Sequence, residues 1–141
     1  MVTLALFGCP GVERPIERPI ARLVNVDIAR SASGKVTAAV RFELSNPNDG
    51  TLSLSAVDWQ LAFEGTTPIR GRTRDVAALP ARTSKTVEVS LDIHEAVGEV
   101  LLSRIDSGAS FYRISGVLHF LGRKGDVAVQ FDQTGDLADS D

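Results

Sequence analysis

The sequence predicts a two-sheet β-sandwich with one helix placed before its last two strands. About seven short segments alternate apolar and polar residues, which is typical of half-buried strands. Clusters rich in Gly, Pro, Asn and Asp separate these segments and favour turns. The chain has 141 residues, of which 43% are hydrophobic and 23% are charged. These totals are typical of one globular domain that buries its own core.

The strand that sets the register lies at residues 36–45. Its apolar side chains occupy every second position: Val36, Ala38, Val40, Phe42 and Leu44. Pro47 follows, which cannot donate a ladder hydrogen bond and keeps Asn46 out of helical space. The residues up to Gly50 have side chains that favour a turn. We therefore expect the strand to end in a rigid turn.

Two neighbouring segments repeat this alternation. Residues 23–29 predict a first strand whose core-facing side chains are Val24, Val26 and Ile28. A further strand opens at Leu52, and its apolar positions change phase by one residue near Ser55. Such a change of phase indicates a β-bulge, since one extra residue moves the following side chains to the opposite face.

A helix is predicted at about residues 93–107. Asp92 is placed to cap it, and Glu95 completes a capping box. Apolar residues recur at every fourth position: Ile93, Val97, Leu101 and Ile105. Gly108 is expected to end the helix. The remaining alternating strands are expected at residues 86–93, 111–121 and 126–131.

The first nine residues are apolar and end on Gly8 and Cys9. This pattern resembles the end of a bacterial lipoprotein signal and predicts Cys9 as a lipid attachment site. No basic residues precede it, so we expect the natural start codon to lie further upstream. The alternative is an apolar N-terminus with an idle thiol. Because Cys9 is the only cysteine in the sequence, neither an intrachain disulfide nor a cysteine metal cluster can form.

A tandem repeat of Glu-Arg-Pro-Ile occupies residues 13–20. Proline at every fourth position blocks a helix or a central strand and favours an extended chain. We therefore divide the sequence into a signal-like segment, a tether, a folded domain and an acidic tail, at residues 1–9, 10–20, 21–135 and 136–141. The alternative for the tether is a segment that packs along the edge of the domain.

Catalysis, cofactor binding and metal binding are not predicted. The two histidines, His94 and His119, are isolated, and no Gly-x-Ser-x-Gly motif is present. Asn46, Asn48 and Asp49 offer oxygen ligands for calcium, but without a bidentate glutamate a turn explains them better. The net charge of −3 gives no indication of a nucleic-acid partner. The sequence thus predicts a protein that is not an enzyme.

Three arginines at period two, Arg70, Arg72 and Arg74, point to one face if they lie on a strand. They fit contact with an anionic surface, either lipid headgroups or an acidic partner. They also fit a second role, in which charged side chains protect an edge strand against aggregation. The second role is favoured, and the first is retained.

Several motifs, taken in order, resemble the motifs of a known family. They are Asn46-Pro47-Asn48, the segment 57–61 around Trp59, the segment 79–81, the segment 87–91, and 112–116 with Tyr112 and Gly116. The chain resembles the late embryogenesis abundant (LEA) type 2 family, also called the water stress and hypersensitive response (WHy) domain. The resemblance implies an immunoglobulin- or fibronectin-III-like β-sandwich, in which these motif residues are structural, and carries over no catalytic residues.

The resemblance also implies a role in desiccation and stress, with chaperone-like protection of other proteins. Bacterial members are often lipoproteins, and Pro10 after the cysteine implies an outer-membrane lipoprotein that faces the periplasm. If Cys9 is not processed, a cytoplasmic location is expected instead. The expected partners are unfolded client proteins or a membrane surface, bound weakly.

Two alternatives from other functional classes remain open at this point. One is a carrier of lipid or another small ligand, with an apolar groove between the helix and the sheets. The other is a structural adaptor in an envelope complex that docks through Arg70, Arg72 and Arg74.

Overall fold

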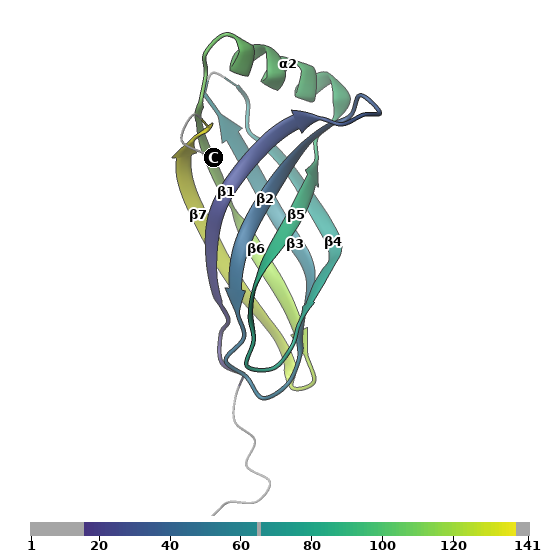
Figure 1. Ribbon diagram of the computed structural model, residues 1–141, viewed down its shortest axis with the longest axis vertical. Coiled ribbons are helices and arrows are strands. Elements are labelled where there is room, and N and C mark those ends of the chain that lie inside the picture. Colours follow the sequence, from purple (N-terminus) through teal and green to yellow (C-terminus); the bar gives the residue numbers. More distant parts are fainter. Residues whose placement is uncertain (1–15, 65, 138–141) are drawn as a thin grey trace, which may run out of the picture.

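The computed structural model describes residues 16–64 and 66–137, and within them seven strands and one helix form a β-sandwich (Figure 1). The strands are β1 (Ile20–Arg30), β2 (Val36–Ser45), β3 (Leu52–Phe63), β4 (Ile69–Leu79), β5 (Ser84–Asp92), β6 (Phe111–Gly122) and β7 (Gly125–Asp136). The helix α2 (Glu95–Asp106) lies between β5 and β6. The predicted fold class is confirmed.

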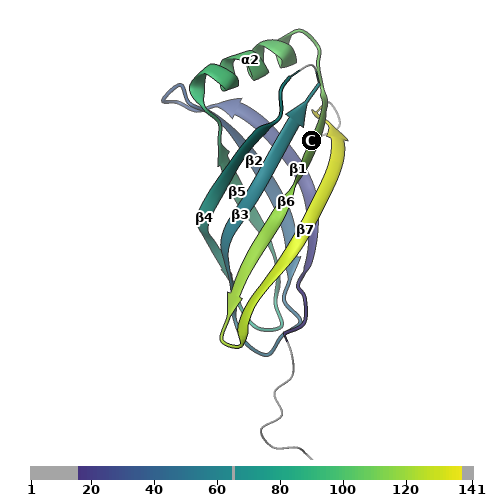
Figure 2. The same cartoon turned by 180° about the vertical axis from the view of Figure 1, so that it is seen from behind.

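The strands form two antiparallel sheets that pack face to face. One sheet has three strands in the order β1-β2-β5, and the other has four in the order β4-β3-β6-β7. Figures 1 and 2 show that α2 covers one end of the sandwich, and that the turn between β6 and β7 lies at the opposite end. We call these the helix end and the strand end.

Alternation builds the core as predicted. In β2 every second side chain is buried, and in β3 the same holds on each side of a register shift between Leu54 and Ala56. The predicted bulge near Ser55 is therefore confirmed. The two sheets meet through aromatic contacts such as that of Phe42 with Phe131, whose ring centroids lie 5.2 Å apart. Edge-to-face packing of this kind adds to the stabilisation from buried area.

The prediction for the first strand is wrong at Val24. A register shift between Leu23 and Asn25 turns the strand by one residue. As a result Leu23 and Val26 are buried, whereas the side chain of Val24 is 43% exposed. The sequence does not reveal this bulge, because Leu23 and Val24 are adjacent apolar residues, and either can face the core ahead of Val26.

The helix begins later than predicted, and Asp92 does not cap it. His94 is the N-cap residue and makes no side-chain capping bond, while Asp92 stays in β5 and pairs with Lys35 at 3.4 Å. The backbone N–H of Ile93 still donates to the carbonyl of Val36, which holds the chain on the sheet. The helix therefore begins after this point. Leu101 and Ile105 still pack on the core as predicted.

The face of α2 that packs on the sandwich contains Gly98 and Leu101, whereas the predicted Val97 is 38% exposed. A Cβ at position 98 would lie 2.7 Å from the Cβ of Val36, so the glycine allows the helix to approach β2 closely. Gly108 ends the helix as predicted, with a φ of +100° that favours glycine.

A polar hub at the strand end joins the two sheets. The Asn46 side chain is buried, and its Nδ2 faces the carbonyl oxygens of Gly50, Leu79 and Pro80 at 2.9–3.1 Å. Its Oδ1 accepts hydrogen bonds from the backbone N and the Nδ2 of Asn48, both at 3.0 Å. Every polar atom of this side chain is thus satisfied, as a buried amide requires.

We expect Asn46→Ala to lower the free energy of unfolding by about 2–4 kcal/mol, because it leaves several buried carbonyl and amide groups without partners. Asn46→Asp should be at least as harmful at neutral pH, since a carboxylate oxygen would face the carbonyl oxygens. Urea unfolding checks both variants. Ser84→Ala, which removes an exposed hydroxyl, is the control and should stay within about 0.5 kcal/mol. An Asn46→Asp protein as stable as the wild type would contradict this donor geometry.

Candidate interaction surfaces

The outer faces of both sheets are covered by cross-strand ion pairs. On the three-stranded sheet Arg22 pairs with Glu43 at 2.5 Å, and Arg41 pairs with Glu88 at 3.3 Å. On the four-stranded sheet Arg113 pairs with Asp132 at 2.6 Å. Opposite charges placed across neighbouring strands satisfy each other, which leaves these parts of the faces with little unmatched charge.

The densest polar cluster on the four-stranded sheet centres on Asp58. Arg72 donates to it through Nε at 2.5 Å and Nη2 at 2.7 Å, and His119 Nε2 lies 2.7 Å from Oδ2. Hydrogen bonding from Arg72 is the main reason that the pKa of the Asp58 carboxyl is held well below its usual range; the His119 contact adds to this, and desolvation opposes it. The sequence contains no signal for this cluster, because its members come from three strands.

The three predicted arginines lie on the outer face of β4, an edge strand of the four-stranded sheet. Arg72 is engaged by Asp58. Arg70 and Arg74 form no ion pair with any residue that the structure describes. This geometry is compatible with protection of the edge and with contact to an anionic surface, so both roles remain predictions.

The family-motif residues have structural positions. Trp59 is buried against Gly71, where an added Cβ would overlap the indole ring. Tyr112 is buried against Gly135 in the same way. At Gly116 a Cβ would overlap the carbonyl oxygen of Asp58. Together with the Asn46 hub these positions concern packing and turns, and none of them opens a binding site.

At the strand end, the chain that leads in from Cys9 is held against the domain. Glu17 N donates to Asn48 Oδ1 and Asn48 Nδ2 donates to Glu17 O, both at 2.8 Å. Pro19 is buried, and Ile16 packs against the core. Residues 16–19 therefore pack along the domain, as the alternative prediction has it, and do not form a free spacer. Cys9, Pro10 and residues 11–15 lie outside the described part of the chain.

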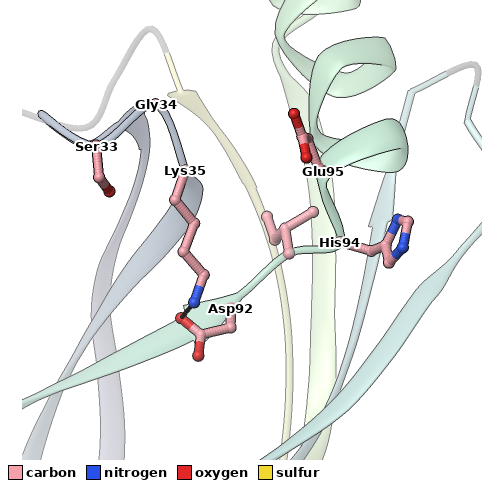
Figure 3. A pocket seen from close by; sticks show the side chains of 7 residues that line it. Ser33, Gly34, Lys35, Asp92, His94 and Glu95 are labelled. Atoms are coloured by element: carbon pink, nitrogen blue, oxygen red, sulfur yellow. Dashed lines mark ion pairs between the residues drawn. The ribbon is translucent and has the colours of Figure 1, made fainter.

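At the helix end, a pocket of about 510 Å³ lies beside the start of α2. Its lining residues are Ser33, Gly34, Lys35, Asp92, Ile93, His94 and Glu95. Figure 3 shows that Lys35 reaches toward Asp92, while the His94 ring points away from that pair. The pocket thus holds no histidine aimed at a hydroxyl, so the serine–histidine form of nucleophilic catalysis has no basis there.

The junction between helix and sheets is filled. Leu101 and Ile93 are almost completely buried there, and Gly98 contacts Val36. This packing gives no support to the predicted apolar groove of a carrier. Within residues 16–64 and 66–137, no group of three or more His, Cys, Asp or Glu side chains is arranged to hold a metal ion. Nor does any described helix have the length and apolar content needed to cross a bilayer.

Exposed large apolar side chains concentrate near the two ends. Ile20 and Leu121 lie toward the strand end, with exposed fractions of 67% and 47%. Val100 lies on α2 and is 53% exposed, beside the exposed Val97, and Phe111 opens β6 at the same end. Because the sheet faces carry paired charges, the two ends are the candidate surfaces for interaction.

We expect Asp58→Asn to destabilise the protein by up to about 1 kcal/mol at pH 7, because solvent screens this half-exposed cluster. The folded-state pKa of Asp58 is depressed, so its stabilising contribution is present above the unfolded-state pKa of about 4 and is lost as the pH falls toward the folded-state value. The difference between wild type and variant should therefore shrink below about pH 4. Urea unfolding at a series of pH values tests this, with Glu88→Gln as a control for the loss of a carboxylate. Equal stability of wild type and Asp58→Asn at pH 7 would contradict it.

Solved structures share this fold. A protein from Arabidopsis thaliana, AT1g01470, superposes with a TM-score of 0.60 at 12% identity, over 95% of this chain and 90% of that one. The LEA protein At2g46140.1 gives a TM-score of 0.54 at 16% identity, over 87% and 75%. A protein from Archaeoglobus fulgidus gives 0.57 at 11% identity, over 86% and 94%. At these identities the likeness concerns the fold alone.

A comparison with curated proteins finds no sequence that matches. The family described as "Late embryogenesis abundant protein" (LEA_2) matches residues 41–135. This range runs from β2 to β7 and contains the Asn46 hub, Trp59 and Tyr112. The predicted resemblance is thereby confirmed. Since the match spans more than half of the chain, the protein belongs to the LEA type 2 family of stress-related proteins.

Proposed function

We propose that this protein is a membrane-tethered, non-catalytic LEA type 2 module that protects other proteins during desiccation or related stress through weak surface contacts. The observation that carries the proposal is the pair of hydrogen bonds between Asn48 and Glu17. They fix residue 17, which follows Cys9 in the sequence, at the strand end. An acyl group on Cys9 would therefore hold the strand end toward the membrane, and a protein with Pro10 after that cysteine would face the periplasm from the outer membrane.

In this orientation the helix end points away from the membrane (Figures 1 and 2). Val97 and Val100 lie three residues apart and are both exposed on α2. Glu95 and Glu99 lie on the same helix, and Glu99 pairs with Arg30 of β1 at 2.5 Å. Exposed apolar side chains among charges suit weak contact with the apolar segments of a partly unfolded client, while the charges oppose self-association.

The non-catalytic part of the proposal draws on the chemistry of the described surface. His94 points away from the ion pair of its pocket (Figure 3). His119 Nε2 lies 2.7 Å from Asp58 Oδ2. Neither histidine is placed as a base beside a nucleophile. Other short polar contacts have structural roles: Arg30 joins β1 to α2 through Glu99, and Glu64 accepts from the backbone N–H groups of Ser110 and Phe111 where β6 begins.

The anchor is tested by the intact mass of the protein isolated from membranes of its native host, expressed from its own start codon. We expect a chain that begins at Cys9 and carries diacylglyceryl and acyl groups. Cys9→Ser should abolish the modification and release the protein from the membrane fraction. An unmodified wild-type chain in the soluble fraction would refute the anchor and leave only soluble protection.

Protection is tested by the aggregation of an enzyme that is heated or dried with the full chain at near-equimolar ratio. We expect less aggregation than with an inert protein of equal mass. Val97→Ser/Val100→Ser should weaken protection, since it removes the exposed apolar surface of α2, and valine and serine have similar helix propensities.

The matched control for that experiment is Val24→Ser, which removes an exposed valine from the side of β1. It should leave protection unchanged, and thermal unfolding must show that all variants remain folded. If the inert protein protects equally well, the proposed function is wrong. If both valine variants lose protection equally, the helix end is not the contact surface.

A further inference from the structure

The strand end carries an excess of basic side chains. Arg18 precedes β1, Lys85 lies at the start of β5, and Arg123 and Lys124 form the turn between β6 and β7. All four are exposed. We call this set the basic end.

The acidic side chains nearby are mostly engaged. Asp49 pairs with Arg82 at 2.5 Å, and Glu43 pairs with Arg22 at the same distance. Each of these pairs is neutral as a unit. Glu17 and Asp126 are the acidic side chains that lie among the residues of the basic end. The positive charge of this end is therefore only partly offset.

Two surface pockets bring this charge next to apolar groups. One, of about 430 Å³, has Ile20 and Lys85 in its wall. The other, of about 450 Å³, is lined by Ile16, Arg123 and Lys124, among others. Leu121, two residues before this turn, is also exposed. Basic side chains beside exposed aliphatic ones suit a lipid interface, where the former meet headgroups and the latter reach the acyl boundary.

The helix end has the opposite charge. Among the described residues, its acidic members are Glu64, Asp92, Glu95, Glu99, Asp106 and Asp136, and its basic members are Arg30, Lys35, Arg70 and Arg104. The molecule is therefore polarised along its long axis, although its formal net charge is only −3. An anionic membrane would attract the strand end and repel the helix end, which orients the domain.

We infer that the basic end is a docking surface for anionic phospholipid bilayers. The occupant follows from charge complementarity and from the sequence before the described residues: the described chain begins at this end with Ile16 and Glu17, and residues 1–9 that precede it in the sequence are apolar. This inference deepens the proposed function, since it names the surface that faces the membrane. It concerns electrostatic contact and does not require an acyl group on Cys9.

The experiment uses the full chain with Cys9→Ser, so that no acylation contributes. Cosedimentation with phosphatidylcholine vesicles is compared with cosedimentation with vesicles that also contain phosphatidylglycerol. We expect binding only to the anionic vesicles, and its loss at high salt, because screening shortens the reach of surface charges. Equal cosedimentation with and without phosphatidylglycerol would overturn the inference.

Two charge-matched variants locate the surface. Lys85→Gln/Arg123→Gln removes two charges from the basic end, and Arg70→Gln/Arg74→Gln removes two from the outer face of β4. None of these four side chains forms an ion pair with a described residue. Both variants should therefore keep the wild-type unfolding midpoint.

The basic-end variant should bind anionic vesicles about thirtyfold more weakly, while the β4 variant should bind like the parent chain. Equal losses would mean that net charge alone drives binding, and a loss confined to the β4 variant would assign the contact to the predicted arginine face. Either result overturns the inference. The vesicle experiment lacks the acyl group and the client, so its failure is separable from failure of the anchor and of the protection.

Discussion

The buried amide of Asn46 is the interaction on which the rest of the structure depends. It stands where the chain leaves the three-stranded sheet and enters the four-stranded one, and it bonds to loop carbonyls that follow both β2 and β4. Asn48 extends the hub, because its backbone carbonyl accepts from Arg82 and its side chain holds Glu17. One polar cluster thus fixes the approach of the sheets and the point where the N-terminal chain joins them. A buried network of this kind specifies a geometry only when all its members are satisfied.

The two ends of the sandwich are built differently. At the strand end the hub joins the loop after β2 to the end of β4 and to the chain before β1. At the helix end, α2 closes the core with Gly98 and Leu101 and leaves its valines exposed. A filled core with two unlike ends favours contact at surfaces over enclosure of a ligand.

Features that depend on neighbouring residues can be predicted from the sequence, whereas features that depend on distant contacts cannot. Period-two alternation involves neighbouring residues, so it predicts β2. It also predicts the bulge near Ser55, where the apolar positions change phase. The bulge at Val24 is not predictable, since only tertiary packing decides which of the adjacent apolar residues Leu23 and Val24 is buried. The same holds for the start of α2, because a hydrogen bond from Ile93 to distant Val36 overrides the capping box.

The candidate surfaces show a similar division. Arg70, Arg72 and Arg74 attract attention in the sequence because they are adjacent at period two, yet Asp58 from β3 neutralises the middle one. The basic end escapes sequence inspection because Arg18, Lys85 and Arg123 are separated by long stretches of chain. In an antiparallel sheet the start of one strand lies beside the end of its neighbour. This topology brings the separated basic residues together at the strand end.

The charge polarity and the position of the N-terminal chain are independent features that agree. The first arises from side chains on three strands or turns, and the second from two hydrogen bonds between Asn48 and Glu17. A tether at a random point of the sandwich would leave the molecule free to present either end or a sheet face. If Cys9 is acylated as proposed, a tether at the basic end would add to the electrostatic torque of an anionic surface, and even weak attraction would suffice to hold the domain upright. The helix end would then stay accessible, and contacts at the two ends would not compete.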